Sequence, residues 1–348
     1  MGKHEETASA WDLTDEGLTL IMYGAVASEM LHAGKELGVF AHLSDHPGST
    51  SRELADAVAL DEYPLDILLT GLRGLRLVLG DDSGLRNHPL VEERYVQGKD
   101  ALHLPFIHDI VNPGIGDFVE SLRTSTNAGL RHFPGQGDSL YQRLRSDPGK
   151  QRQLHDHIHA ISDSAMAGLI KTGALDGCRH LLDVAGGIGR NAITIAKHYP
   201  DLKITVVDLP PVVEAAAKNI ADHGLTEQIS TVACDVFNEP LPTGADSAFL
   251  THVMPLWPAQ TNVEILRKVH AVLPQGGNLL LFDAMQNDTR DGPLGTVLFP
   301  AYFLSVATGR GNFHPPTAYA DWMAEAGFDQ VKRFEGLPVD HCLHVGVK

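Results

Sequence analysis

The second half of the chain alternates short apolar runs with amphipathic segments, and this alternation constrains the fold more than any other feature. Parallel strands need a crossover between them, so alternating strand and helix predicts one parallel sheet with helices on both faces. The expected strands are 180–184, 203–207, 229–233, 247–251 and 278–282, with a helix at 192–198. The runs 330–334 and 342–347 are expected to add an antiparallel edge pair. Residues 176–348 thus predict an α/β domain of the Rossmann-like type.

The first hundred residues have a mostly helical pattern. Apolar residues recur with helical spacing through 14–44, and Gly38 ends that pattern. Thr50 and Glu53 form a capping-box pair that predicts a helix over 51–57. Asp61 is expected to cap a further helix, whose apolar stripe is Leu65, Ile67, Leu68, Leu69 and Leu72. The turn 80–84 then joins 77–79 to 85–86 as a hairpin, which predicts a winged-helix-like domain over 1–100.

Charge and composition exclude several classes of protein. The net charge of −17 repels phosphate backbones and anionic lipid, so neither nucleic acid nor a membrane is expected as a partner. The three cysteines form no CxxC pair and suit a reducing cytoplasm. Residues 1–10 lack the apolar core of a secretion signal, and no apolar run approaches the roughly 20 residues of a membrane span. A cytoplasmic protein is expected.

Small residues follow the first expected strand, in the run Asp183-Val184-Ala185-Gly186-Gly187-Ile188-Gly189. They let a ligand approach the backbone closely. Twenty-five residues after Asp183, the second strand ends in Asp208, which is placed to accept hydrogen bonds from ribose hydroxyls. After the third strand, a carboxylate with two apolar neighbours suits an adenine. The expected cofactor-binding residues are Asp183, Gly186, Gly187, Gly189, Asp208, Leu209, Asp235, Val236 and Phe237.

The acidic residue before the turn indicates which cofactor binds. Asp183 would repel the pyrophosphate of a dinucleotide but attract the ammonium of an amino-acid ligand. S-adenosylmethionine has a ribose, an adenine and an ammonium but no phosphate. The sequence therefore predicts an S-adenosylmethionine-dependent methyltransferase.

Several motifs resemble the plant-type and bacterial small-molecule O-methyltransferases over nearly the whole chain. They include Ala33–Phe40, Leu182–Gly189, Val207–Pro210, Ile265–His270 and Ala324–Phe328. The resemblance implies a homodimer formed through the N-terminal domain. It also implies that a helical linker, 101–175, contributes to the substrate pocket. The pocket residues it implies are His159, Met254, Phe299, Tyr302 and Phe303.

The chain departs from this family at two places. The family has a His-Asp-Trp-like signature whose histidine deprotonates the substrate hydroxyl. Aligned on Trp257, this chain has Pro255 at that position, and proline cannot exchange a proton. Near Gly311 the family has an acidic residue that positions the base, whereas here His314 stands beside that place.

Two histidines and a carboxylate are therefore expected around one cavity. His252 and Asp283 end strands at the carboxyl edge of the sheet, and His314 is the third member. Such a set can hold a divalent metal, zinc or iron among others. The alternatives are a structural role for His252 and His314, and a role for Asp283 as a base or as a partner of a histidine. The three residues are the expected catalytic and metal-binding set.

The altered pattern is similar to a branch of the family that methylates C3 of 2-oxo acids in peptide natural-product pathways. The resemblance implies that a metal grips the oxo acid and stabilises its enolate, which attacks the sulfonium methyl. O-methylation of a phenolic or polyketide hydroxyl is the alternative within the enzymes. A family member that binds the cofactor without methyl transfer, or a non-enzymatic regulator, are further alternatives.

Overall fold

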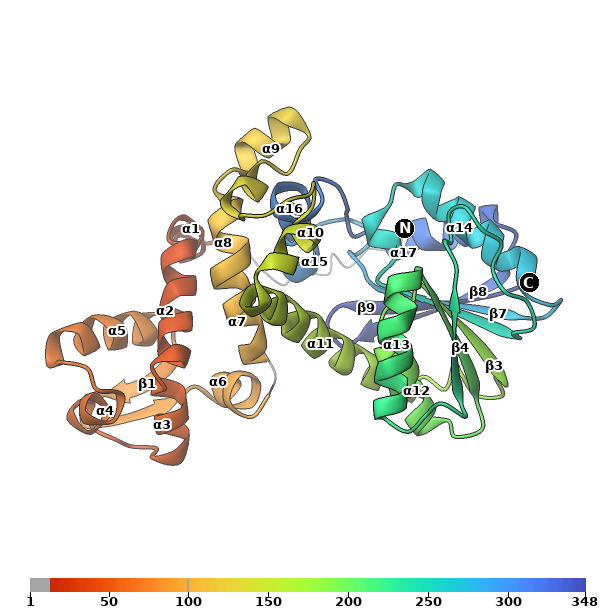
Figure 1. Cartoon of the computed structure of the whole chain (residues 1–348). Coiled ribbons are helices and arrows are strands. Elements are labelled where there is room, and N and C mark those ends of the chain that lie inside the picture. The colour runs from red at the N-terminus through yellow and green to blue at the C-terminus, as the bar shows by residue number, and fades with distance from the viewer. Residues whose placement is uncertain (1–12, 99) are drawn as a thin grey trace, which may run out of the picture. The chain divides into compact units, whose positions relative to one another are not determined.

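The computed structural model describes residues 13–98 and 100–348, and the expectation about residues 1–10 lies outside them. The chain divides into two compact units (Figure 1). The first unit is Met1–Pro113 with Gly149–Ala160, and the second is Gly114–Pro148 with Ile161–Lys348. The expected division into 1–100, 101–175 and 176–348 stays a prediction. Over the described residues, no helix is both long enough and apolar enough to span a membrane.

The first unit consists of helices and one hairpin. Its elements are α1 (Asp15–Met22), α2 (Gly24–Glu36), α3 (Val39–Asp45), α4 (Ser51–Val58), α5 (Glu62–Gly74), β1 (Val78–Asp81), β2 (Gly84–Asn87), α6 (Pro89–Val91) and α7 (His103–Phe106). The capping box is confirmed, since the Thr50 hydroxyl accepts from the Glu53 N–H and the Glu53 carboxylate accepts from the Thr50 N–H. The predicted hairpin is confirmed by the antiparallel pairing of β1 with β2. The winged-helix-like topology stays a prediction.

One sequence expectation in this unit was wrong. The helix expected through 14–44 is three helices, because Tyr23 interrupts it and Gly38, at φ +80°, starts a new direction. A left-handed residue cannot continue a right-handed helix, and glycine adopts that conformation without a steric penalty. In α5, Ile67 of the apolar stripe is 47% exposed, whereas the other four members of the stripe are buried.

The second unit is built on a seven-stranded sheet in the order β5-β4-β3-β6-β7-β9-β8. Its strands are β3 (His180–Val184), β4 (Lys203–Asp208), β5 (Ile229–Ala233), β6 (Ser247–Thr251), β7 (Asn278–Ala284), β8 (Asp329–Leu337) and β9 (His341–Val347). The strands β3 to β7 are parallel, and β9 pairs antiparallel with both β7 and β8. The predicted α/β fold, its strands and its antiparallel edge pair are confirmed.

Helices bury both faces of this sheet, because successive strand residues point to opposite sides. Leu182 and Val184 pack with α14 (Ala259–Val272) and α17 (Pro316–Glu325) on one face. Leu181 packs on the other face with the end of α11 (Pro148–Lys171), with α12 (Arg190–His198) and with α13 (Pro210–Asp222). The remaining helices are α8 (Asn112–Ile115), α9 (Phe118–Thr124), α10 (Leu140–Arg143), α15 (Leu294–Leu298) and α16 (Pro300–Tyr302).

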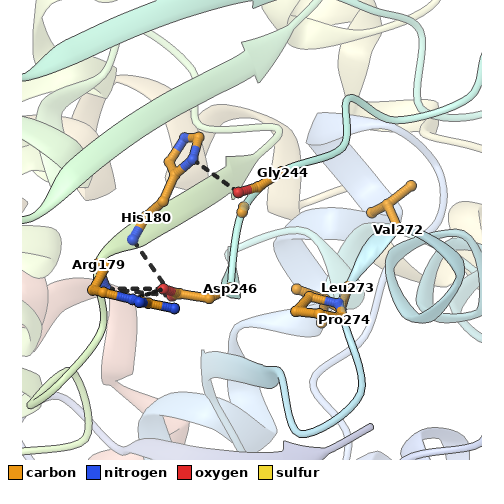
Figure 2. Close-up of a pocket in the computed structure, with 8 residues that line it drawn as sticks. Arg179, His180, Gly244, Asp246, Val272, Leu273 and Pro274 are labelled. Carbon is orange, nitrogen blue, oxygen red and sulfur yellow. Dashed lines mark hydrogen bonds and ion pairs between the residues drawn. The ribbon is translucent and has the colours of Figure 1, made fainter.

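Asp246 organises the amino edge of the sheet. Its carboxylate accepts the backbone N–H groups of Arg179 and His180, the Cys178 thiol and the Arg179 guanidinium at 3.2 to 3.4 Å. Figure 2 shows Asp246 with Arg179 and His180, which line a surface pocket of about 490 Å³. Within the described chain, no residue lining this pocket has a buried polar atom without a partner. We therefore assign it a structural role at the start of β3.

Replacing this carboxylate should destabilise the sheet. Although burial raises the pKa of Asp246, the hydrogen bonds from Cys178, His180 and Arg179 outweigh it and hold the pKa below its ordinary value. A lowered carboxyl pKa stabilises the fold above the unfolded pKa, and that stabilisation is lost as pH falls through the folded pKa. We expect Asp246→Ala to cost about 1–3 kcal/mol in urea unfolding at pH 7 and less at pH 3. Asp201→Ala, at an exposed turn, is the control; equal midpoints for the two variants would contradict the assignment.

Candidate functional site

The carboxyl ends of the parallel strands lie at one edge of the second unit. There β3 is followed by the glycine turn, β4 ends in Asp208, β6 is followed by His252, and β7 carries Asp283. The chain order reverses between β3 and β6, which are neighbours in the sheet. Open α/β sheets bind their ligands in the crevice at such a switch point. The geometry thus gathers most of the expected site residues at one edge.

Asp183 is a buried carboxyl without a partner. Its side chain is 0% exposed, and neither carboxyl oxygen has a hydrogen-bond partner among the described residues. Burial and the neighbouring Asp208 raise its pKa from 3.8 to about 7. A buried, unsatisfied polar group costs free energy, so a cationic partner is the complement that this position lacks.

The turn after β3 leaves room for a ligand at its backbone. A Cβ on Gly186 would lie 2.5 Å from the Asp183 carboxylate, so only glycine fits there. Ala185, at φ +57°, is a non-glycine residue in the left-handed region, a strained conformation that is common at functional sites. The Asp208 carboxylate accepts the N–H of Gly187 at 2.9 Å and that of Leu209 at 2.7 Å. Asp208 therefore fixes the turn against the end of β4 and keeps free lone pairs for a ligand.

The segment after β5 has a polar and an apolar part. The Asp235 carboxylate accepts the Phe237 N–H at 2.9 Å, and the Phe237 ring meets Trp257 edge-on at 4.8 Å. Lys268 from α14 donates to the carbonyls of Val236 and Phe237 at 2.7 and 2.5 Å and so holds the segment in place. Lys268 was not among the expected site residues, although it lies in the motif Ile265–His270.

These residues fit S-adenosylmethionine. The buried, unpartnered Asp183 matches an ammonium, and the Asp208 carboxylate matches ribose hydroxyls. Three large apolar side chains beside the expected site are exposed to water: Ile188 by 42%, Leu209 by 48% and Phe237 by 41%. Exposed apolar side chains around a polar cradle are typical of a ligand site.

His252 has an unusual backbone at the end of β6. Its φ is +58°, which is uncommon outside glycine. The Asp283 carboxyl accepts the backbone N–H of His252 and that of Met254, which ties this turn to β7. Burial raises the pKa of Asp283 well above its ordinary value, while its second oxygen is buried without a partner among the described residues. Asp283 therefore positions the backbone of His252.

The His252 ring pairs with a residue that the sequence did not indicate. Its Nε2 lies 2.9 Å from the Nε2 of His341, the first residue of β9. His341 is 2% exposed, and its Nδ1 lies 2.8 Å from the Val339 carbonyl oxygen. Burial lowers the pKa of His252 to about 4 and that of His341 to about 3. No linear motif connects the two, which are 89 positions apart.

The expected metal site is not assembled. No group of three or more His, Cys, Asp or Glu side chains over the described ranges is arranged to hold a metal ion. The His252 Nε2 faces a second imidazole, and the His314 ring packs edge-on against Trp322 at 4.9 Å. One oxygen of the Asp283 carboxyl accepts the backbone N–H of His252, and no second or third ligand from this set lies beside the other oxygen in the described residues. The set His252, Asp283 and His314 therefore does not fit a metal, and this expectation is corrected.

An aromatic cluster lies beside the Pro255 turn. The contacting rings of this cluster have centroids 5.0 to 6.1 Å apart and belong to Phe299, Tyr302, Phe303 and Phe313. Gly311 connects the cluster to the turn, since a Cβ on it would lie 3.1 Å from the Pro255 carbonyl and 3.4 Å from Phe303. Phe313 was not among the expected pocket residues.

The predicted pocket residue Met254 is 0% exposed within the core, because its turn folds back on α14. His159 belongs to the first unit, where its ring stacks on His155.

Comparison with known proteins places this geometry in a family. The O-methyltransferase domain matches residues 117–329. The L-tyrosine C(3)-methyltransferase of Streptomyces lavendulae is 30% identical over 90% of this chain and 87% of that protein. The 3-hydroxy-5-methyl-1-naphthoate 3-O-methyltransferase of Streptomyces sahachiroi is 28% identical, over 90% of each chain.

Solved structures agree with these matches. The S-adenosylmethionine-dependent methyltransferase SibL, in its apo form, is 33% identical and has a TM-score of 0.89 over 95% of this chain and 98% of that one. Human N-acetylserotonin methyltransferase in complex with S-adenosylmethionine has the same fold, with a TM-score of 0.77 at 23% identity over 98% and 99% of the chains. The chain belongs to the O-methyltransferase domain family and is an S-adenosylmethionine-dependent methyltransferase.

Proposed function

We propose that this enzyme methylates a carbon atom, the ring position next to the hydroxyl of a phenolic amino acid or a close derivative. The observation that carries the proposal is the 30% identity to an L-tyrosine C(3)-methyltransferase over nine-tenths of the chain. A second relative, 27% identical over 95% of this chain, is a mitomycin biosynthesis 6-O-methyltransferase. A role in natural-product biosynthesis is part of the proposal.

The chemistry suits the residues at the acceptor side of the edge. Loss of the phenol proton raises the electron density at the neighbouring ring carbon, which can then attack a sulfonium methyl group. The carbon–methyl bond forms as the sulfur–methyl bond breaks, and the ring then loses its own hydrogen as a proton. Pro255 cannot take the phenol proton, so we assign that role to His252, the imidazole at the end of β6. S-adenosylmethionine, when bound, supplies the methyl group.

The aromatic cluster supports an aromatic acceptor. Phe299 and Phe313 are only partly buried, whereas Tyr302 and Phe303 are 3% and 7% exposed. Aromatic rings offer offset-stacked and edge-to-face contacts to another ring. We therefore propose Phe299, Tyr302 and Phe303 as pocket residues, together with Phe313. His314 stays a candidate for substrate contact, and the expectation that His159 lines the pocket stays a prediction from the sequence.

A 2-oxo acid is the second candidate acceptor. Its enol has the same arrangement as a phenol, with a hydroxyl next to a nucleophilic carbon, so His252 would perform the same deprotonation. Pro255 favours both carbon acceptors over a hydroxyl acceptor that relies on the family base. The metal that was expected to bind the oxo acid is not part of this proposal, because the described residues do not assemble its ligands.

Product analysis decides between these acceptors. The purified enzyme is incubated with S-adenosylmethionine and L-tyrosine, ring-hydroxylated relatives of tyrosine, aromatic 2-oxo acids or simple phenols. We expect S-adenosylhomocysteine and a product with a new aryl carbon–methyl bond, identified by mass spectrometry and NMR. His252→Ala should lower kcat by about 10²- to 10⁴-fold, the usual contribution of a general base. A methoxy product or a C3-methylated oxo acid would overturn the phenolic proposal.

Metal removal gives an independent prediction. Prior dialysis against a chelator should leave kcat unchanged, since no described cluster holds a metal. Lys268→Met is a useful companion variant, because it loosens the segment of Val236 and Phe237 without touching the acceptor side. It should raise the Kd for S-adenosylmethionine. Activity that a chelator abolishes and zinc or iron restores would reinstate a metal site.

We also propose that the Asp183 carboxylate binds the ammonium of S-adenosylmethionine. The free carboxyl is protonated below its raised pKa of about 7, and binding a cation favours its ionised form. Binding therefore releases a proton, and the affinity weakens as pH falls from 7 to 5, by up to about tenfold per pH unit. Calorimetry in buffers of different ionisation enthalpy measures both effects. Asp183→Asn should abolish the slope, and a flat profile in the wild type would refute this role.

We also propose that the chain forms a homodimer through the first unit. Helices α1 and α2 of the first unit expose a run of large apolar side chains, and the family resemblance implies that a second copy covers them. The most exposed are Leu18, Ile21, Met22, Tyr23 and Val26, at 49% to 74%. Such a surface on one helical pair is typical of an interface.

Charged substitutions test this surface. Ile21→Glu with Met22→Glu should convert the dimer to a monomer in light scattering, since each buried apolar side chain contributes about 1.5–3 kcal/mol. Glu16→Gln on the same helix is the control. Unchanged affinity for S-adenosylmethionine would show that the second unit is still folded. A wild-type protein that is monomeric at micromolar concentration would rule the proposal out.

A further inference from the structure

We propose that His341 is a positioning residue that fixes the ring and the tautomer of His252, so that the His252 Nδ1 is the unprotonated nitrogen available to the acceptor hydroxyl. The role of His252 as the base rests on the proposed function. The pairing itself rests only on the geometry of β6, β7 and β9.

The hydrogen bonds determine the tautomers in sequence. The His341 Nδ1 lies 2.8 Å from the Val339 carbonyl, which can only accept, so this Nδ1 carries a hydrogen. A neutral imidazole has one N–H, and the His341 Nε2 is therefore an acceptor. The His252 Nε2, 2.9 Å away, must be the donor. The lone pair of His252 is thus confined to Nδ1.

Burial keeps both rings neutral, which this sequence of hydrogen bonds requires. Burial lowers the pKa of His252 to about 4, and burial together with His252 lowers that of His341 to about 3. The titratable groups that contact His252 are His341 from β9 and the Asp283 carboxyl from β7. Asp283 meets the backbone N–H of His252 and leaves the ring to His341.

Packing prevents the His341 ring from turning. It is 2% exposed, lies 4.8 Å from the Phe282 ring and meets His252 at an interplanar angle of 75°. Its backbone is paired with Ala284 at the end of β7. His252, in contrast, is partly exposed, and its Nδ1 has no hydrogen-bond partner in the described part of the chain. The His341 ring is fixed, and His252 directly follows β6 at the carboxyl edge of the sheet, where open α/β sheets bind their ligands.

The arrangement also accommodates the proton. When the acceptor O–H bond breaks, the proton forms an N–H bond at the His252 Nδ1, and the resulting imidazolium keeps its Nε2–H bonded to His341. The neutral His341 Nε2 accepts this charge-assisted hydrogen bond, which is stronger than the neutral one. The proton leaves to solvent or to the acceptor oxygen after the carbon–methyl bond has formed. A ring N–H that donates to a fixed acceptor holds its imidazole in one tautomer and one orientation.

Histidine NMR and kinetics together test the pairing. Protein labelled with ¹⁵N-histidine is compared as wild type, His341→Gln and His341→Leu, with His252→Ala to assign the signals. Glutamine keeps an acceptor near the Nε2 position, whereas leucine removes it. His344→Gln changes another buried histidine of β9 and is the matched control. Thermal unfolding confirms that each variant is folded.

The expected result is an Nε2–H tautomer of His252 in the wild type, His341→Gln and His344→Gln, and a mixture of tautomers in His341→Leu. With the acceptor that the product assay identifies, His341→Leu should lower kcat by about 10- to 100-fold, with the KM for S-adenosylmethionine unchanged. His341→Gln should recover most of that loss. An Nδ1–H tautomer in the wild type, or a His341→Leu enzyme with wild-type kcat, would overturn the proposal.

The role of His341 and the acceptor of the methyl group are tested by separate measurements. The tautomer is measured without any acceptor, so an O-methylated product would end the carbon-methylation proposal while the NMR result still decides on His341. Carbon methylation that is indifferent to both His252→Ala and His341→Leu would end the proposal for His341 and leave the reaction assignment standing.

Discussion

The carboxyl group of Asp183, buried without a partner at the switch point of the sheet, is the constraint on which the cofactor side depends. A pKa raised from 3.8 to about 7 corresponds to about 4 kcal/mol of unfavourable free energy when the folded protein holds this group ionised. With a raised folded pKa, this destabilisation grows as pH rises from the unfolded value toward 7. Such a cost is large against the 5–15 kcal/mol of a typical domain. On the role proposed for Asp183, the ammonium of bound S-adenosylmethionine offsets this cost.

The surrounding geometry follows from this one carboxyl. Gly186 must be glycine because the Asp183 oxygen occupies the space of its Cβ. Asp208 raises the pKa of Asp183, and at the same time its hydrogen bonds to Gly187 and Leu209 join the turn to β4. On the other side of the switch point, Asp283 makes the same kind of connection, since its carboxyl holds the backbone of His252. Two buried carboxyls thus organise the two halves of one edge.

Local pattern predicted one half of this edge better than the other. The residues of the glycine turn, Asp208 and Asp235 follow their strands directly, so strand periodicity and parallel topology were enough to place them. His341 lies on an antiparallel strand 89 positions from its partner, and only the register between β7 and β9 brings it to His252. The metal expectation failed for the same reason. Three suitable residues were expected at one edge, but the directions of their side chains depend on packing that residue spacing does not encode.

Pro255 replaces the histidine base of the family, and the proposed base, His252, lies elsewhere. This change of position suits methylation at carbon. In the family resemblance the base belongs to position 255, whereas here the available imidazole lies three residues earlier, where β6 ends. On the proposed function, a hydroxyl that binds to His252 lies next to the end of β6 and not next to position 255. The cofactor motif keeps the family pattern, so the acceptor is the part of the complex whose position differs. The acceptor atom opposite the methyl is then not the oxygen itself but the atom two bonds away from it. In a phenol or an enol, that atom is the nucleophilic carbon.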